Sequence, residues 1–469
     1  MPTTNVVEEP EERYQFSWPG KRNAICMANA PATNILLPVR EESVDFDNTK
    51  NLYIEGDNLE VLKLLRQDYL GKIGTIYIDP PYNTGNDFVY NDDLTHVDWL
   101  NMMYPRLMVA KDLLSENGAI FISIDHHELV NLVEICDELY GMNNRIGIIS
   151  VINNMKGRSD DAFFATCNEF LVVYAKSRRS LSIKGFALGE EELDDDYDQQ
   201  DETGHYKLIG YRKTGNAWKR EERPHMYYPV LYKDGVFSTA SEDELNRIYD
   251  AKTRLFDDDF ADKLTTAYNS KGYQVFWPLS EKGEKGRWRW GIETFYQQKD
   301  TNLGMNKTGT LCTKMRATLE DGSIRMKSAK TLWYKPEYDT GSSARLLASL
   351  LGKAGLFQNP KSLAYLKDIL TIATDRDSII LDFFSGSATT AHAVMQLNAD
   401  DDGKRQFIMV QLPEPVSEKS EAYKAGYKNI CEIGKARIRE AGKRIKSEHR
   451  KAKNTDTGFR VLRLDSTSS

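Results

Sequence analysis

Two consecutive prolines directly after an apolar run constrain the fold more than any other feature of this chain. Residues 75–82 read Thr-Ile-Tyr-Ile-Asp-Pro-Pro-Tyr, and the β-branched and aromatic residues 76–78 predict a buried central strand. Neither proline can donate a main-chain hydrogen bond, and each disfavours helical backbone in the residue before it. The strand must therefore end in a stiff, extended corner with Asp79 at its tip. In an open α/β sheet, the carboxyl ends of the strands are where ligands bind.

The residues of this corner suit an exocyclic amine on a flat heterocycle. Such an amine has two in-plane N–H donors, which the Asp79 carboxylate and the Pro80 carbonyl can accept, while the ring of Tyr82 stacks on one face. This arrangement would draw the nitrogen lone pair out of conjugation and aim it at an electrophile. Taken alone, the tetrapeptide is also compatible with an ordinary strand that happens to end in two prolines.

A second motif lies near the other end of the chain. Residues 378–390 read Ser-Ile-Ile-Leu-Asp-Phe-Phe-Ser-Gly-Ser-Ala-Thr-Thr, which predicts a strand, a tight turn and a helix. The glycine lets the backbone approach a ligand closely, and the helix N-terminus adds free N–H donors. The turn lacks the lysine that a phosphate-binding P-loop requires, which argues against a nucleotide triphosphatase.

Both motifs resemble those of one enzyme family. Residues 79–82 resemble the catalytic tetrapeptide of S-adenosylmethionine-dependent DNA amino-methyltransferases, in which Asp at the first place is typical of adenine N6 enzymes and Ser is common in cytosine N4 enzymes. The turn at 382–388 is similar to their Phe-x-Gly-x-Gly cofactor loop, with Ala388 in place of the last glycine. The order of catalytic corner, insert and cofactor turn marks the beta class. Together with the strand at 51–57, these motifs are most similar to the Mod subunits of type III restriction–modification systems.

The resemblance implies a fold and an activity. The fold would be α/β, a Rossmann-like methyltransferase fold that is circularly permuted and carries an inserted α+β target-recognition domain. Both halves would supply parallel strands to one doubly wound sheet, so that Asp79 and Asp382 meet at neighbouring strand tips. The enzyme would methylate the N6 amine of an adenine flipped out of double-stranded DNA. It would act as a homodimer and join a separate helicase–nuclease restriction subunit.

The resemblance and the changes in composition along the chain together give five expected segments. We expect an N-terminal arm at 1–50, a catalytic half at 51–180 and a cofactor-binding half at 346–415. Between these halves, residues 181–345 interleave basic and aromatic residues, which suits phosphate contact and base stacking and predicts the target-recognition domain. Residues 416–469 read as a basic helical segment, whose charges form either a solvated face or a DNA-phosphate contact.

The expected site residues fall into three groups. The catalytic residues are Asp79, Pro80, Pro81 and Tyr82. The resemblance implies a cofactor site at Asp57, Lys361, Asp382, Phe383, Phe384, Ser385, Gly386, Ser387 and Thr389. The expected substrate-binding residues are Asn83, Glu169, Phe170, Arg212, Trp218 and Arg287.

Among these cofactor assignments the role of Asp57 is open, and so is the identity of the residue that binds the ribose. Asp57 can equally cap the helix that follows it. Lys361 would meet the carboxylate of the cofactor. For the cofactor ribose, Gln411 stands where relatives have an acidic residue and Glu414 follows three positions later, so both remain candidates.

Other features limit the function classes. The cluster Asp125-His126-His127-Glu128 suggests a metal ligand set, but Asp125 and Glu128 also form a capping-box-like pair, and we expect no metal. Five cysteines without CxxC spacing predict neither zinc nor a disulfide framework and favour a reduced, cytoplasmic protein. No apolar run approaches the roughly 18 residues of a membrane span. A net charge of −8 argues against a nucleic-acid coat but leaves local DNA contacts open.

Three rival functions share parts of this pattern. A cytosine N4 enzyme would have the same fold and mechanism, and mass analysis of methylated nucleosides would distinguish it. A non-catalytic DNA-reading subunit would bind the cofactor without methylating any DNA. A protein or RNA amine methyltransferase would not need the large insert.

The role of the insert can be tested by deletion. Removing residues 181–345 is expected to abolish DNA binding, because this segment carries the basic and aromatic side chains that would read the target. DNA binding is measured by gel shift with duplex DNA that contains a site methylated by the full chain. A deletion variant that binds DNA as the full chain does would favour the protein or RNA methyltransferase.

Overall fold

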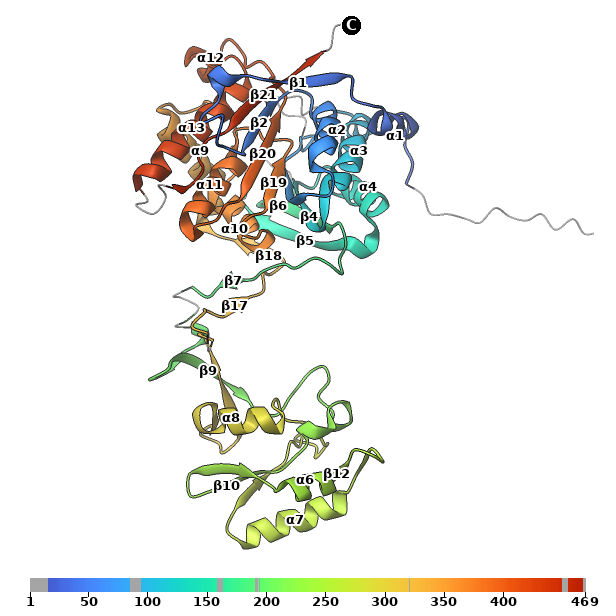
Figure 1. Ribbon diagram of the computed structural model, residues 1–469, viewed down its shortest axis with the longest axis vertical. Helices are drawn as coiled ribbons and strands as arrows, with labels where there is room; N and C mark the ends of the chain where they lie inside the picture. Colours follow the sequence, from blue (N-terminus) through green and yellow to red (C-terminus); the bar gives the residue numbers. More distant parts are fainter. Residues whose placement is uncertain are drawn as a thin grey trace, which may run out of the picture. The chain divides into compact units, whose positions relative to one another are not determined.

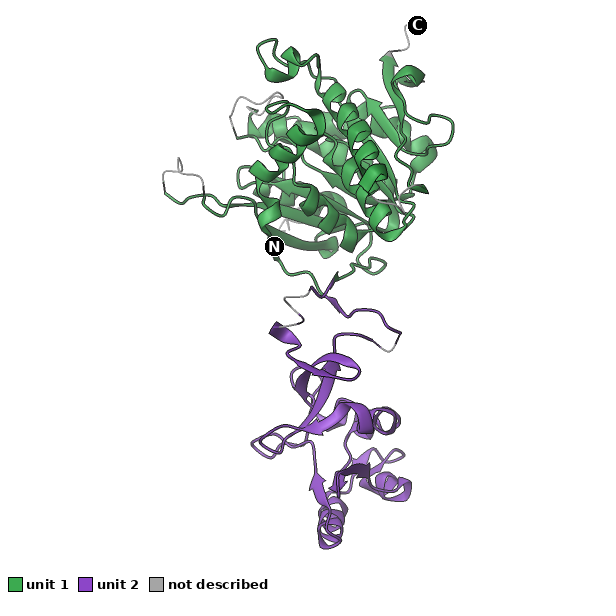
Figure 2. Cartoon of the chain, turned by 90° about the vertical axis from the view of Figure 1, so that its left-hand side faces the viewer, with its two compact units in different colours: residues 1–186, 328–469 green, residues 187–327 purple. Residues whose placement is uncertain are grey.

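The chain is divided into two compact units in the computed structural model (Figures 1 and 2). The first unit comprises residues 1–186 and 328–469, and the second comprises residues 187–327. The structure describes residues 16–84, 94–157, 163–189, 193, 195–319, 321–448 and 454–466. The acidic start of the chain, the loop from Gly85 onward and the basic residues 449–453 lie outside the described residues.

Within the described residues, the first unit is built on a ten-stranded sheet. The strands in spatial order are β1 (Asn34–Pro38), β21 (Arg460–Ser466), β2 (Leu52–Glu55), β20 (Gln406–Gln411), β19 (Ile379–Asp382), β3 (Ile73–Ile78), β4 (Leu114–Ile124), β6 (Asn168–Ala175), β5 (Arg145–Ile152) and β18 (Leu332–Tyr334). From β21 to β4 every neighbouring pair is parallel. Strand β6 runs antiparallel to both β4 and β5, and β1 runs antiparallel to β21.

Helices cover both faces of this sheet, and the side chains of β3 show why. Ile76 and Ile78 belong to one hydrophobic core and Tyr77 to another, because successive side chains of a strand point to opposite faces. A sheet buried on both faces needs apolar residues at every position, as residues 76–78 supply. The first core is covered by α2 (Asn58–Tyr69), α3 (His96–Leu113) and α4 (Leu129–Tyr140), and the second by α10 (Leu363–Ala373), α11 (Thr389–Asp401) and α13 (Ile430–Glu448). This doubly wound arrangement confirms the expected fold class.

The pairing of β3 with β19 sets the position of the site. Thr75 pairs with Ile380 and Ile76 with Leu381, in parallel. Because parallel neighbours end at the same edge of a sheet, the residues after β3 and the last residue of β19 lie side by side. The prediction that Asp79 and Asp382 meet at neighbouring strand tips is confirmed.

The second unit has its own antiparallel sheets and its own core. Strands β10 (Val230–Lys233), β11 (Val236–Thr239) and β14 (Gln274–Phe276) form one sheet, and β8 (Gln199–Asp201), β9 (Gly204–Gly210), β15 (Leu303–Met305) and β16 (Leu311–Arg316) form another. Its longer helices, among the described residues, are α6 (Glu242–Ile248), α7 (Asp258–Ser270) and α8 (Ile292–Asn302). The core is largely aromatic and includes Tyr211, Tyr228, Trp288 and Phe295. This α+β insert is shorter at both ends than the expected 181–345. At its C-terminal end the reason is that β18 joins the sheet of the first unit.

Both outer segments of the chain contribute strands, and this corrects two expectations. Residues 1–50 were expected to form an arm and 416–469 a helical segment, yet β1 and β21 pair from Asn34↔Ser466 to Pro38↔Leu462. Strand β21 also pairs in parallel with β2. The alternation in this strand places Val461 in the second core and packs Leu462 against the first. The helical prediction is wrong here because a strand of this length is stabilised by distant partners and not by local pattern.

Two basic residues of α13 are interior and not surface residues. Lys435 is 3% exposed and pairs with Glu55 and Glu42, while Arg437 is 0% exposed. The expectation that the basic residues of this segment form a solvated face or a DNA-phosphate contact is therefore wrong for these two.

Among the described helices, none is both long and apolar enough to cross a bilayer.

The strand position of Val461 can be tested by truncating its side chain. Val461→Ala should lower the free energy of unfolding by about 2 kcal/mol, because Val461 is 0% exposed in the second core. The exposed neighbour Asp465→Ala should change it by less than about 0.5 kcal/mol. Scanning calorimetry measures both, and equal melting temperatures for the two variants would contradict the assignment of β21.

Candidate active site

The proline corner is fixed from behind by α3. Trp99, fully buried on that helix, donates a hydrogen bond from its Nε1 to the carbonyl oxygen of Pro81, at 2.8 Å. Since neither proline can donate to a neighbouring strand, this bond and the ring constraints hold the corner in place. The Asp79 side chain remains 27% exposed at the tip.

Asp79 and Tyr82 belong to one ionic network with two residues from distant elements. The Lys361 Nζ lies 3.3 Å from Asp79 Oδ1, 2.8 Å from both oxygens of Glu169 and 2.5 Å from the Tyr82 hydroxyl. The Tyr82 hydroxyl in turn donates to Glu169 Oε2 at 3.2 Å. The corner, strand β6 and the segment before α10 therefore converge on one site.

Burial and charge set the protonation of this network. Burial raises the pKa of Asp79, Lys361 opposes that rise, and Glu169 adds to it. Burial alone would lower the pKa of Lys361, but Asp79 and Glu169 outweigh it and hold that pKa above its ordinary value. Lys361 therefore stays charged, and it balances two neighbouring carboxylates.

A cavity of about 670 Å³ opens in front of this network. Its walls include Asp79, Pro80, Tyr82, Asn153, Glu169 and Lys361. Oxygen Oδ1 of Asp79 is buried and is ion-paired with Lys361 at 3.3 Å, but it accepts no hydrogen bond of good geometry from the described residues. An unsatisfied buried acceptor is costly, so a donor from a ligand in this cavity would be stabilising.

The second motif forms the turn that was expected between β19 and α11. Asp382 is 2% exposed and accepts hydrogen bonds from Phe384 N at 3.1 Å and Thr390 Oγ1 at 2.6 Å. Gly386 N donates to Gln411 Oε1 at 2.8 Å. Ala388 has a φ of 61°, in the left-handed region that favours glycine. This backbone conformation explains why the resembling family has a glycine at the place of Ala388.

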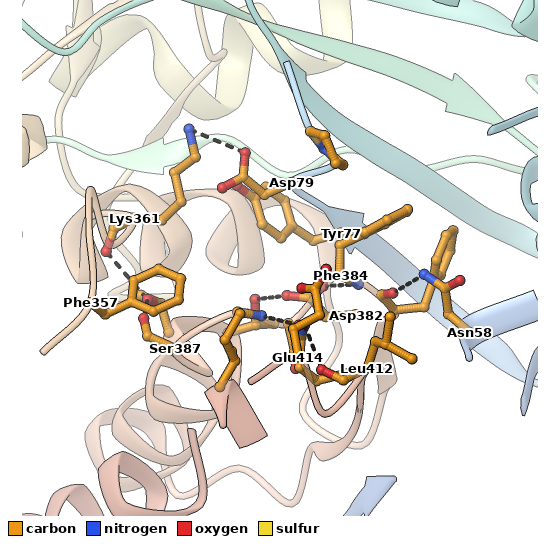
Figure 3. Close-up of a pocket in the computed structure, with 18 of the residues that line it drawn as sticks. Asn58, Tyr77, Asp79, Phe357, Lys361, Asp382, Phe384, Ser387, Leu412 and Glu414 are labelled. Atoms are coloured by element: carbon orange, nitrogen blue, oxygen red, sulfur yellow. Dashed lines mark hydrogen bonds and ion pairs between the residues drawn. The ribbon is translucent and has the colours of Figure 1, made fainter. Parts of the chain in front are cut away.

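The turn lines a second cavity, of about 250 Å³ (Figure 3). The expected cofactor residues in its walls are Asp57, Lys361, Asp382, Phe383, Phe384, Ser385, Gly386, Ser387 and Thr389. Asp79 and Lys361 line both cavities, and Figure 3 shows the Lys361 amine directed at the Asp79 carboxylate. The two cavities therefore adjoin at Asp79, as a transfer between two ligands requires.

The groups in the second cavity fit S-adenosylmethionine. Carboxyl groups of Asp57, Asp382 and Glu414 line it and can accept from hydroxyl and ammonium groups. The hydroxyl oxygen of Ser385 is buried without a hydrogen-bond partner among the described residues. A Cβ on Gly386 would lie 3.3 Å from the ring of Phe357, so the turn has little space for a side chain there.

Asp57 caps α2, which is one of its two expected roles, and it also lies in the wall of the second cavity. Its Oδ1 accepts from Leu59 N at 3.0 Å and so caps α2, while its Oδ2 accepts from Arg106 Nη2 at 2.9 Å within the cavity wall. The neighbouring Asn58 donates from Nδ2 to Phe383 O at 2.7 Å and thereby ties α2 to the cofactor turn. Neither Asn58 nor Arg106 was expected here, because neither belongs to a motif.

Two expected substrate residues do not line either of these cavities. Asn83 donates from Nδ2 to Glu128 Oε1 at 2.7 Å, and its Oδ1 accepts from Leu94 N at 2.8 Å. Phe170 packs against the first core. Asn83 therefore supports the corner from the side.

The expected DNA-reading residues lie in the second unit, and one of them is interior. Arg287 is 9% exposed and donates to the carbonyl oxygens of Ala217 at 2.5 Å and Trp288 at 3.2 Å. These bonds make Arg287 a structural residue of this unit. Arg212 and Trp218 are half-buried.

The acid and histidine cluster is part of the turn before α4. Single ligand atoms of Asp125, His126 and His127 lie within 4.8 Å of one another. Asp125 accepts from the main chain and the ring of His127, at 2.9 and 2.8 Å. The expected Asp125–Glu128 capping pair is not formed, because Glu128 binds Asn83 and Asn131 instead.

Comparison with known proteins identifies the family of this chain. The model of the DNA methylase family, the N6/N4 methyltransferases, matches residues 73–427. The chain belongs to the DNA methylase family. It is a DNA methyltransferase, and its cofactor is S-adenosylmethionine.

Three relatives match over most of the chain. The EcoPI Mod subunit, a type III restriction–modification enzyme of Escherichia phage P1, is 36% identical over 97% of this chain and 72% of its own length. The type II methyltransferase M.KpnI of Klebsiella pneumoniae is 31% identical over 84% and 88%. The EcoP15I Mod subunit of Escherichia coli is 30% identical over 98% and 72%.

The carboxyl groups of the cofactor cavity predict a pH dependence of cofactor selection. Burial raises the pKa of both Asp382 and Glu414 to about 7, so both are neutral at low pH and ionised above neutrality. Ionised carboxylates attract the sulfonium of S-adenosylmethionine but not the neutral thioether of S-adenosylhomocysteine. The affinity ratio of the two ligands should therefore shift by about tenfold towards S-adenosylmethionine between pH 6 and pH 8.

Titration calorimetry at both pH values measures this ratio. Charges common to the two ligands cancel in it. Glu414→Gln should flatten the dependence, and a ratio independent of pH in the unsubstituted protein would contradict the assignment.

Proposed function

We propose that this DNA methyltransferase modifies the N6 amine of adenine within a short specific site and serves as the modification subunit of a type III restriction–modification system. The observation that carries this proposal is the position of Asp79, the residue typical of adenine enzymes, at the junction of the two cavities. The names of the EcoPI and EcoP15I relatives support the same assignment.

Base flipping is the first step of the proposed mechanism. The N6 amine is paired within a duplex, so the adenine must leave the stack at a cost of a few kcal/mol. Stacking on the ring of Tyr82 would return about 1–3 kcal/mol of this cost. The cavity in front of Tyr82 is the proposed base pocket.

The corner then orients the amine. Asp79 Oδ1 and the Pro80 carbonyl accept the two N6 hydrogens and turn the nitrogen lone pair towards the adjoining cavity. Oδ1 faces Lys361 at 3.3 Å but accepts no hydrogen bond of good geometry from the described residues. S-adenosylmethionine supplies an electrophilic methyl group on sulfur when bound. Lys361 keeps Asp79 ionised and thus able to accept, since the burial of Asp79 favours its neutral form. Most of the rate would come from positioning and electrostatics, without a covalent enzyme intermediate.

The cofactor would be held by residues of both halves. The turn at 382–389 contributes main-chain and hydroxyl groups, and Asp57 contributes a carboxylate from the other half. For the ribose we favour Glu414 over Gln411. The Gln411 side chain is already engaged with Gly386 N and with Leu412 O, whereas the Glu414 carboxyl lines the cavity.

The proposed assembly follows the type III assignment. The chain would form a homodimer on double-stranded DNA and bind a separate restriction subunit. The described cysteines are all free, which suits a reduced, cytoplasmic setting. Cytosine N4 methylation remains the second candidate, because both amines would meet the same acceptors at Asp79 and Pro80.

Long-read sequencing of DNA from cells that express the protein tests the base and the site together. N6-methyladenine in one recurrent asymmetric sequence is the expected result. N4-methylcytosine in its place would overturn the assignment to adenine.

Substitution of the corner tests its catalytic role. Asp79→Ala should reduce methyl transfer by at least about 100-fold, because it removes the acceptor that orients the amine. DNA binding should remain largely intact, since it would depend on the insert. Incorporation of tritiated methyl groups into DNA and a gel shift measure the two properties, and unsubstituted turnover in the variant would remove Asp79 from the mechanism.

A further inference from the structure

One buried cation next to the cofactor cavity has no carboxylate partner among the described residues. Arg437 on α13 is 0% exposed, and no acidic side chain of the described chain lies within ion-pair distance of it. Lys435, two residues earlier on the same helix and equally buried, is paired with Glu55 and Glu42. A buried charge without compensation is costly, so the exception at Arg437 calls for a physical reason.

The contacts of Arg437 lead to the cofactor turn. Its Nη1 donates to Ser387 Oγ at 3.0 Å and to Thr389 Oγ1 at 2.7 Å, and both residues line the cofactor cavity. Each hydroxyl oxygen therefore accepts a hydrogen bond from the guanidinium, which leaves its own hydrogen available to donate. The other contacts of these hydroxyls are long, with 3.3 Å from Thr389 Oγ1 to Lys361 O and 3.4 Å between the two hydroxyls. Their hydrogens can be redirected to a better acceptor in the cavity.

The surroundings of the two hydroxyls favour an anion. Helix α11 begins at Thr389, so its N-terminal N–H groups add positive potential at the same place. Burial lowers the pKa of Arg437 to about 9, which leaves the guanidinium charged at neutral pH. The helix end and the buried charge act in the same direction.

The other cations at the cavity are already neutralised. Arg106 pairs with Asp57 at 2.9 Å, and Lys361 pairs with Glu169 at 2.8 Å. The remaining ionisable lining groups include the carboxyls of Asp382 and Glu414. These carboxyls suit the cationic parts of S-adenosylmethionine, but its carboxylate needs a positive region.

We propose that Arg437 is the positioning residue for the cofactor carboxylate. Through Ser387 and Thr389 it turns two hydroxyls into hydrogen-bond donors facing the cavity and places an uncompensated positive charge behind them. The carboxylate then supplies the counter-charge that the chain itself lacks. This role replaces the expectation that Lys361 meets the carboxylate, since Lys361 is engaged at the catalytic corner.

The test compares two ligands that differ in the amino-acid part. S-adenosylhomocysteine carries the carboxylate, whereas 5′-methylthioadenosine has the same adenosine and thioether without it. Arg437→Met should weaken binding of S-adenosylhomocysteine by about tenfold, the size of a lost charge-assisted interaction, and that of 5′-methylthioadenosine by less than about twofold. Titration calorimetry on the full chain gives both dissociation constants.

A matched control separates this role from a structural one. Lys435→Met removes an equally buried cation from the same helix, and it should leave the ratio of the two dissociation constants unchanged. Arg437→Gln, which can still donate to the hydroxyls but lacks the charge, gives the same comparison if the Met variant does not fold. An equal effect on both ligands, or none on S-adenosylhomocysteine, would overturn the proposal.

Discussion

The parallel pairing of β3 with β19 is the interaction on which the rest of the structure depends. It joins strands about 300 residues apart, and a hydrogen bond of 3.0 Å from Thr75 Oγ1 to Ala373 O also ties β3 to the end of α10. Because of it, the end of one strand carries Asp79, the group proposed to orient the amine, and the end of its neighbour begins the turn that lines the second cavity. The chain order separates these two halves, and the sheet reunites them. The insert at 187–327 can therefore form its own compact unit without altering the strand pairing.

Charge is distributed unevenly across the two cavities. At the junction, Lys361 pairs with both Asp79 and Glu169, so three ionisable side chains share one network. In the cofactor cavity, carboxyls with raised pKa values lie in the walls, while a buried guanidinium stands behind the turn. A ligand that carries both a sulfonium and a carboxylate matches such a separation of charge. Burial makes each of these groups more sensitive to its partners than it would be in water.

The sequence predicted the elements that carry local signals. The apolar run at 76–78 with two prolines behind it defines a strand end on steric grounds alone, and the strand–turn–helix around Gly386 is equally local. The fold class followed from these motifs and from their order. The position of Asp57 at the start of α2 was also predictable, because an aspartate between a strand and a helix commonly caps the helix.

Other features were not predictable because they depend on distant contacts. Nothing local shows that Lys361 would bind Glu169 and Tyr82, or that Asn83 would bind Glu128. The basic residues of α13 look alike in sequence, yet Lys435 and Arg437 point inward. For Arg287, an arginine close to two tryptophans suggested DNA contact, but its guanidinium bonds to carbonyl oxygens of its own unit. Whether such a basic side chain lies in the interior or on the surface depends on contacts with distant segments, which the local sequence does not reveal.

The position of β21 between β1 and β2 has a consequence for synthesis of the protein. Strand β2 is made early, yet its neighbour on one side, residues 460–466, leaves the ribosome about 400 residues later. Until then, one side of β2 offers unpaired main-chain groups, a state that invites association between nascent chains. Pairing of β2 on this side therefore follows the synthesis of about 400 further residues, and a chaperone that covers the edge in the interval would limit such association.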